Sequence, residues 1–122
     1  MTQIVTPAQI EKRLYDLSKE IDEAHNELVE AEASYNRIKS AYEISMAKSR
    51  MGYASKSSPV GKNYTVQERD DLALIDNEAL HMQIGFAEAS VKAARANSTR
   101  IKTQVEIARS IGTSVRTSLD LA

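Results

Sequence analysis

Residues 10–42, IEKRLYDLSKEIDEAHNELVEAEASYNRIKSAY, contain the pattern that decides the fold. Apolar residues recur there at alternating steps of four and three: Ile10, Leu14, Leu17, Ile21, Ala24, Leu28, Ala31, Tyr35, Ile38 and Tyr42. A repeat of about 3.5 residues keeps one seam of a helix against a partner helix. The stretch therefore predicts a long helix that lies along a second helix.

Capping signals predict where this first helix begins. Thr6 can cap a helix, Pro7 suits the first helical position, and Gln9 can complete a capping box. No further proline and no glycine follow until residue 52, so the helix is predicted over residues 7–50.

A loop and a second helix are predicted to follow. Residues 51–64 contain two glycines, a proline and three serines, which is typical of a loop. Thr65 and Glu68 have the spacing of a second capping box. The second helix is therefore predicted over residues 66–119, and the whole chain, residues 1–122, is predicted to be one helical-hairpin domain.

Blocks of opposite charge predict that the two helices run antiparallel. Residues 11–32 carry eight acidic and three basic side chains, whereas residues 83–104 carry four basic and one acidic. The signs reverse near the loop, where residues 37–50 are basic and residues 65–78 are acidic. These blocks favour a register in which facing residue numbers sum to about 115. The alternative, that they are ordinary solvated faces, stays open.

The second helix carries two neighbouring apolar stripes. The first is Leu72, Ile75, Ala79, Met82, Phe86, Ala89 and Ala93. The second contains Leu80, Ile84, Val91, Ile101, Val105, Val115 and Leu119. Two stripes can serve two neighbours. We therefore expect an all-α, two-helix coiled-coil hairpin that forms a dimer (a four-helix bundle) or binds a partner, with the second stripe as the oligomer seam. One broad face that shifts along the helix is the alternative.

Composition narrows the classes of function. Sixteen basic and seventeen acidic residues give a net charge of −1, which argues against a grip on nucleic acid or lipid by the whole protein. The chain has no cysteine, which excludes disulfides, a thiolate nucleophile and cysteine-ligated zinc. It has neither a leader-like N-terminus nor a long apolar run. We expect a soluble, cytoplasmic protein without a membrane partner.

The residues that most often carry chemistry do not form a recognisable site. His25 and His81 are predicted to lie roughly 14 Å apart along the hairpin, too far to share one metal ion. Gly61-Lys62-Asn63 lacks the spacing and the hydroxyl of a phosphate-binding loop. We therefore expect no catalytic, cofactor-binding or metal-binding residues, no small-molecule substrate and no enzymatic activity.

The tip of the hairpin is the one local electrostatic feature. Residues 48–64 contain no acidic side chain. Cations beside aromatic rings suit single-stranded nucleic acid, because they bind phosphates and stack on bases. The candidate contact residues for nucleic acid or another partner are Arg50, Tyr53, Lys56, Lys62 and Tyr64. The alternative is a solvated connector whose cations also cap the first helix.

Two segments carry a resemblance to known proteins. One joins Tyr42-Glu43-Ile44 to Thr65-Val66-Gln67-Glu68-Arg69 across the loop; the other comprises Ala87-Glu88-Ala89, Val91, Ala93-Ala94-Arg95, Arg109-Ser110-Ile111-Gly112 and Arg116. From about Tyr35 onward, the chain resembles small uncharacterised proteins of tailed bacteriophages that infect actinobacteria and related hosts. Such proteins are often encoded near recombination and replication functions, which implies an accessory role in DNA metabolism.

These observations lead to one expectation of function and two alternatives. We expect a non-enzymatic, phage-encoded coiled-coil module in the host cytoplasm that binds itself, another protein, or both, as an accessory factor of DNA recombination or replication. The alternatives are a structural or assembly factor of the virion, and an inhibitor of a host enzyme or defence system.

Overall fold

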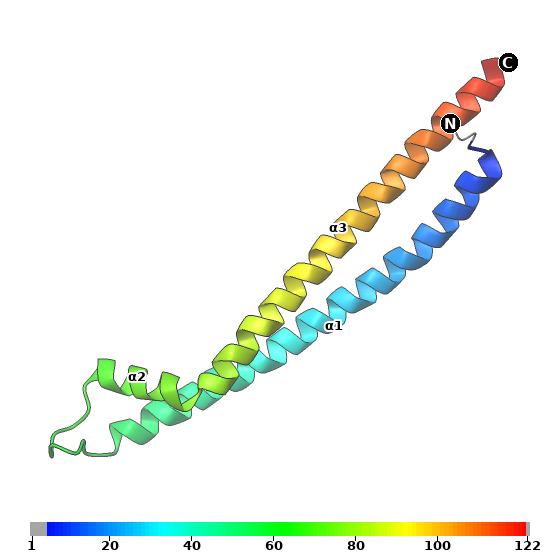
Figure 1. Cartoon of the computed structure of the whole chain (residues 1–122). Coiled ribbons are helices and arrows are strands. Elements are labelled where there is room, and N and C mark those ends of the chain that lie inside the picture. The colour runs from blue at the N-terminus through cyan, green and yellow to red at the C-terminus, as the bar shows by residue number, and fades with distance from the viewer. Residues whose placement is uncertain (1–4, 122) are drawn as a thin grey trace. The chain divides into compact units, whose positions relative to one another are not determined.

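A computed structural model describes residues 5–121 and contains three helices (Figure 1). They are α1 (Pro7–Ala54), α2 (Val66–Asp76) and α3 (Glu78–Leu121). The two long helices, α1 and α3, pack against each other and run in opposite directions (Figure 1). The predicted all-α helical hairpin is therefore confirmed.

The chain divides into two compact units. Unit 1 combines Met1–Glu30 with Lys92–Ala122, and unit 2 is Ala31–Val91. Both long helices contribute to both units, so the prediction of a single domain stays a prediction.

The core of unit 1 consists of side chains from the first part of α1 and the last part of α3. Its buried members are Leu17, Ala24, Ile101 and Ala108, and Leu14, Ile21 and Val105 pack against them. Leu17 has no exposed surface. The core is narrow because only one seam of each helix faces the other.

The seam predicted for the first helix is confirmed. All ten apolar residues, from Ile10 to Tyr42, are buried or half-buried. The same spacing continues through Ser45 and Ser49, which are both half-buried in unit 2. Polar residues thus follow the apolar ones along one seam.

The predicted start of α1 is confirmed and its predicted end is wrong. The backbone N–H of Gln9 donates to the Thr6 hydroxyl, and the Thr6 N–H donates to the Gln9 amide oxygen, which is the expected capping box. At its other end, α1 continues past Arg50 to Ala54. Gly52 lies inside the helix, because the side chains on either side of it, at positions 50 and 53, bond to α2 and hold this last turn.

The second predicted helix is broken at Asn77. The capping box between Thr65 and Glu68 is confirmed and starts α2 as expected. The helix predicted over residues 66–119 is nevertheless two helices, because α2 ends at Asp76 and α3 begins at Glu78. Asn77 is the C-cap of α2, with a backbone conformation outside the helical region.

The register within each unit differs from the predicted one by about one heptad. In unit 1, Ile10 lies beside Gly112; in unit 2, the Tyr42 ring lies 5.7 Å from that of His81, and Ser45 bonds to Asn77. Facing residue numbers therefore sum to about 122 rather than 115. The longer α1 moves the loop along the chain, to residues 55–65. A shift of seven residues leaves the same residues in the seam, because the pattern repeats every seven.

The residues of the seam proposed for an oligomer are largely covered within the chain. Val91 in unit 2 and Ile101 in unit 1 are buried, while Leu80, Ile84, Val105 and Val115 are half-buried. Only Leu119 of that set is exposed. Ile101 packs with Leu17 and Ala24 of α1 in the core of unit 1. An interface between these residues and a second chain stays a prediction.

Two glycines of α3 have opposite surroundings, which gives a test of packing. A methyl group added at Gly85 would meet nothing within 4 Å, whereas one at Gly112 would lie 3.2 Å from the Ile10 Cγ2 atom. Gly85→Ala should raise the free energy of unfolding by about 0.5–1 kcal/mol, because alanine loses less backbone entropy in a helix. Gly112→Ala should give a smaller gain or a loss. Urea unfolding measures both, and equal gains would contradict the close approach of Ile10.

Candidate functional site

The tip of unit 2 is a tight turn. The Gly61 N–H donates to the Ser58 carbonyl at 2.9 Å, and the Ser58 N–H donates to the Lys62 carbonyl at 2.8 Å. Gly61 has a φ of 79°, a value that glycine adopts without strain. An isolated bridge between Ser57 and Asn63 closes the turn. The loop therefore has a defined backbone although it belongs to no helix or strand.

Three of the five tip candidates, Tyr53, Lys56 and Tyr64, contact one another, and Arg50 and Tyr53 bond to α2. The Arg50 guanidinium pairs with Asp70 at 2.9 Å. The Tyr53 hydroxyl donates to Asp76 at 2.6 Å. The Tyr53 ring meets the Tyr64 ring edge-on at 5.5 Å, and the Lys56 ammonium lies 5.7 Å from the centre of the Tyr53 ring.

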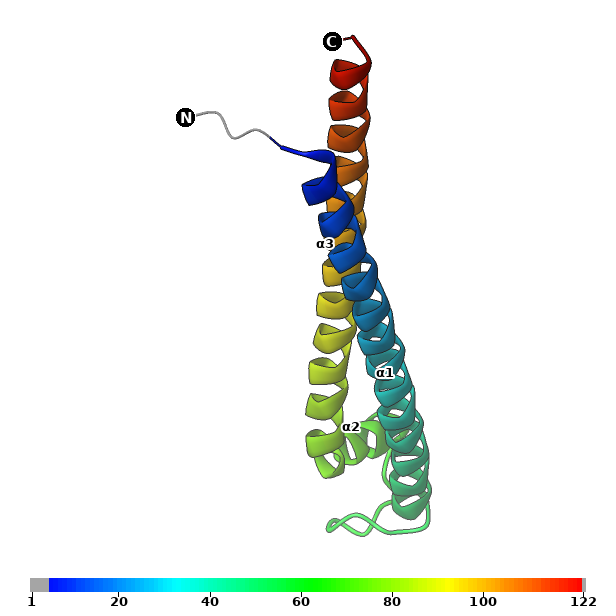
Figure 2. The same ribbon diagram turned by 90° about the vertical axis from the view of Figure 1, so that its right-hand side faces the viewer.

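These contacts change the electrostatic character of the tip. The loop is free of acids in the sequence, yet α2 lies beside the last turns of α1 and brings carboxylates to it (Figure 2). Among the described residues, the Lys62 side chain has no hydrogen-bond or ion-pair partner. Nucleic-acid contact stays a prediction, and the Tyr53 ring that would stack on a base is already in contact with Tyr64.

The Tyr53 hydroxyl provides a test of the tip contacts. Its hydrogen bond to Asp76, followed by desolvation and the charge of Asp76, raises the pKa of Tyr53 above its usual value near 10. The contact therefore stabilises the fold below that usual pKa, and its contribution is lost as pH rises through the raised pKa. The phenolate absorbance of the Tyr53→Phe variant, subtracted from that of the wild type at each pH, gives the titration curve of Tyr53. We expect this curve to show ionisation above pH 10. A difference curve at or below the usual value would contradict the hydrogen bond.

Asn77 is the polar centre of unit 2. Its side chain is 6% exposed and bonds across to α1. The Asn77 amide nitrogen donates to the Ser49 hydroxyl at 3.1 Å and to the Ala73 carbonyl at 2.7 Å, and the Ser45 hydroxyl donates to the amide oxygen. Sequence reasoning missed this cluster. The signal was the appearance of serine at two successive seam positions of α1, which favours a polar partner opposite.

The most exposed apolar side chains of α3 in unit 2 form a second surface. We call Ala79, Met82, Phe86 and Ala89 the outer stripe. All four are exposed, with Met82 at 54% and Phe86 at 68%. They belong to the first apolar stripe predicted from the sequence, and the chain itself leaves them uncovered.

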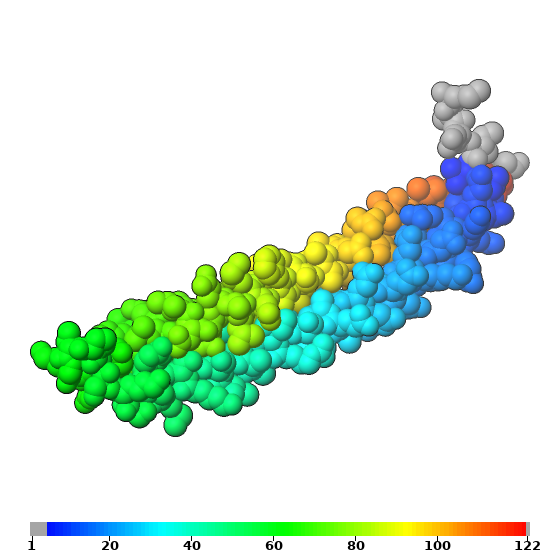
Figure 3. Space-filling view, turned by 60° about the horizontal axis from the view of Figure 1, so that its bottom comes forward, coloured from blue at the N-terminus to red at the C-terminus, as the bar shows by residue number. Residues whose placement is uncertain are grey.

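A groove lies beside the outer stripe. Its volume is about 420 Å³, and its walls include Ala31, Ser34 and Ile38 from α1 and Gln83 and Phe86 from α3. The two helix segments of unit 2 lie side by side along their lengths in the space-filling view, α1 in cyan and α3 in yellow-green (Figure 3). Phe86 is therefore both an exposed anchor and a wall of a recess.

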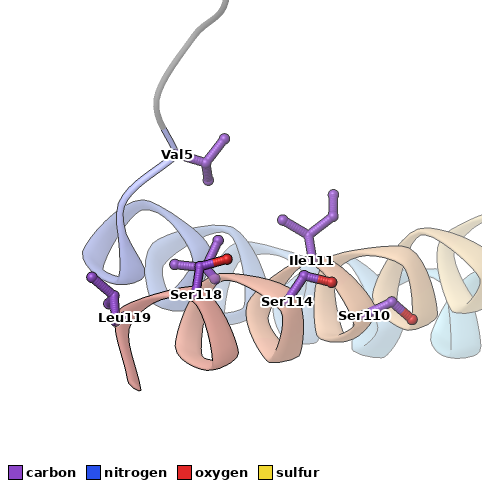
Figure 4. Close-up of a pocket in the computed structure, with 7 residues that line it drawn as sticks. Val5, Ser110, Ile111, Ser114, Ser118 and Leu119 are labelled. Atoms are coloured by element: carbon purple, nitrogen blue, oxygen red, sulfur yellow. The ribbon is translucent and has the colours of Figure 1, made fainter. Parts of the chain in front are cut away.

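A further groove, of about 550 Å³, lies in unit 1 near the chain ends (Figure 4). Along this groove, α3 has a serine at every fourth position, namely Ser110, Ser114 and Ser118. The apolar side chains of Ile111 and Leu119 lie next to these serines in the lining. Val5 stands on the segment that precedes α1 (Figure 4). None of its seven lining residues is titratable, so this groove offers shape and hydroxyl groups rather than acid–base chemistry.

The remaining candidates for chemistry stay apart. Within residues 5–121, no group of three histidine, cysteine, aspartate or glutamate side chains is arranged to hold a metal ion. His81 packs against Tyr42 in unit 2, and His25 belongs to unit 1. None of the helices in this range is long and apolar enough to cross a membrane.

The fold defines the class of protein. The chain is an all-α helical hairpin in which the segment after the loop is divided into α2 and α3. Comparisons with protein-family models, curated proteins and solved structures return no match.

Proposed function

We propose that this chain is a non-enzymatic protein-binding module whose binding surface is the outer stripe of α3. The observation that carries the proposal is that α3 has two apolar stripes, and the hairpin covers only one of them. Phe86 and Met82 are more than half exposed although both are large apolar side chains. Contiguous exposed apolar residues on a helix are typical of a face that binds another protein.

The surrounding chemistry supports binding rather than catalysis. The outer stripe and the neighbouring groove are lined by apolar residues, serines and one glutamine. Aromatic and methionine side chains are enriched in the centres of protein interfaces, and charged residues are depleted there. The outer stripe has this composition.

The biological setting of the proposal rests on the resemblance to phage proteins alone. In that setting the module is an accessory factor of phage DNA recombination or replication. A virion assembly factor and an inhibitor of a host enzyme or defence system remain the alternatives. Mass spectrometry of purified virions separates the virion factor from the other two, because a structural component is present there in stoichiometric amounts.

The binding surface is tested by two matched variants. Affinity purification from infected cells should recover a partner with the wild-type chain and with Ile107→Glu, which changes an exposed apolar residue elsewhere on α3. Phe86→Glu should lose that partner, with affinity lowered roughly tenfold or more when the purified proteins are recombined. If Phe86→Glu and Met82→Glu alter neither self-association nor the capture of any other protein, the proposal is wrong.

A further inference from the structure

Phe86 has the geometry of a self-complementary contact. It is 68% exposed, and it also forms a wall of the 420 Å³ groove in unit 2. If a second copy approaches so that the two Phe86 rings come close together, the Phe86 ring of each copy reaches the groove that lies beside Phe86 of the other copy. Such an isologous contact uses the same patch twice and closes with two copies. An aromatic side chain seated in a recess is the usual anchor of an interface.

The neighbours of Phe86 suit a close, antiparallel contact. Met82 precedes it by one turn, and the small residues Ala79 and Ala89 lie beyond them on the same exposed face. In an antiparallel pair centred at residues 84–85, each phenyl ring lies against Met82 of the other copy, and Ala79 faces Ala89. Small residues at the outer layers let the two helix axes approach.

Charges beside the outer stripe distinguish antiparallel from parallel packing. Glu78 begins α3, and Lys92 follows two heptads later, so helix geometry puts them on the same flank. Both are exposed. Antiparallel packing places Glu78 of each copy beside Lys92 of the other. Parallel packing instead places Glu78 beside Glu78 and Lys92 beside Lys92, which are pairs of like charge.

We infer that the outer stripe binds a second copy of this chain in an antiparallel homodimer, with Phe86 of each copy in the groove of the other and two Glu78–Lys92 ion pairs at its flank. This inference rests on the proposed function and names its partner. The contact is short, so the dimer is expected to dissociate on dilution.

Sedimentation equilibrium of the purified full chain over a concentration series tests the dimer. Wild type and Ile107→Glu should both dimerise. Phe86→Glu should weaken dimerisation roughly tenfold or more, because the symmetric contact loses its anchor twice. Helical circular dichroism of a diluted sample should not change, since Phe86 is exposed within the chain. A wild type that is monomeric at every concentration, or a Phe86→Glu variant that dimerises like wild type, overturns the inference.

A charge swap tests the orientation. Lys92→Glu should weaken the dimer roughly threefold to tenfold, because it creates two pairs of like charges. Adding Glu78→Lys should restore it, since each ion pair is then re-formed with its signs exchanged. A double variant that stays as weak as Lys92→Glu overturns the antiparallel arrangement.

The failure of this inference can be told apart from the failure of the proposed function. If the wild type is monomeric but a different protein is lost on Phe86→Glu, the outer stripe binds proteins and the homodimer is wrong. If Phe86→Glu changes neither self-association nor the capture of another protein, both are wrong.

Discussion

Leu17→Asp is expected to unfold the hairpin or to lower its free energy of unfolding by about 4 kcal/mol or more. Leu17 is fully buried in the core of unit 1, among Ala24, Ile101 and Ala108. Removing a buried leucine side chain alone costs about 2–5 kcal/mol, because it loses apolar burial and leaves a cavity. The aspartate adds the cost of a charge without a partner. Urea or thermal unfolding followed by circular dichroism measures the loss.

Tyr15→Asp is the matched control for Leu17→Asp. Tyr15 is exposed on the opposite side of the same helix, and its ring contacts only the Lys19 ammonium at 4.6 Å among the interactions that the described residues show. The same new charge should therefore cost no more than about 1 kcal/mol at this position. Similar losses for both variants would mean that the seam of α1 is wrongly assigned.

Asn77→Ala is expected to lower the free energy of unfolding by about 2–3 kcal/mol. The substitution removes the amide that bonds to Ser45, Ser49 and the Ala73 carbonyl. A buried donor or acceptor that loses its partner stays desolvated without a compensating hydrogen bond, which lowers the free energy of unfolding. The control is Asn97, which is half-buried and whose side chain, among the bonds of the described residues, accepts only from Arg100 in the same helix. Asn97→Ala should cost within about 0.5 kcal/mol.

A double-mutant cycle separates the hydrogen bond from other effects of Asn77→Ala. Ser45→Ala and Asn77→Ala should be non-additive, with a coupling of about 1 kcal/mol, since the second substitution removes a group already left without its partner. Additive losses would show that Asn77 acts only as a cap of α2.

Some features of the candidate surfaces followed from the sequence, and others did not. The exposed residues Met82 and Phe86 were part of a predicted stripe, but the sequence did not show which of the two stripes α1 would cover. Both stripes have helical spacing and apolar composition, so local pattern does not distinguish them. The acids beside Arg50 and Tyr53 belong to the acidic block, residues 65–78, that was predicted to face the basic end of the first helix, but the candidate contact residues at the tip were chosen without taking them into account.

The sequence by itself determined the all-α class, the N-terminal caps of α1 and α2, and the seam of α1. These features depend on residues one to four positions apart, such as Thr6 with Gln9, and such interactions form wherever the helix lies. The tertiary structure decided the register, the break at Asn77 and the stripe that stays exposed. A heptad pattern matches itself after a shift of seven residues, so apolar spacing alone does not select one register. Contacts between distant segments, above all those of Asn77 with Ser45 and Ser49, occur in one register and thereby select it.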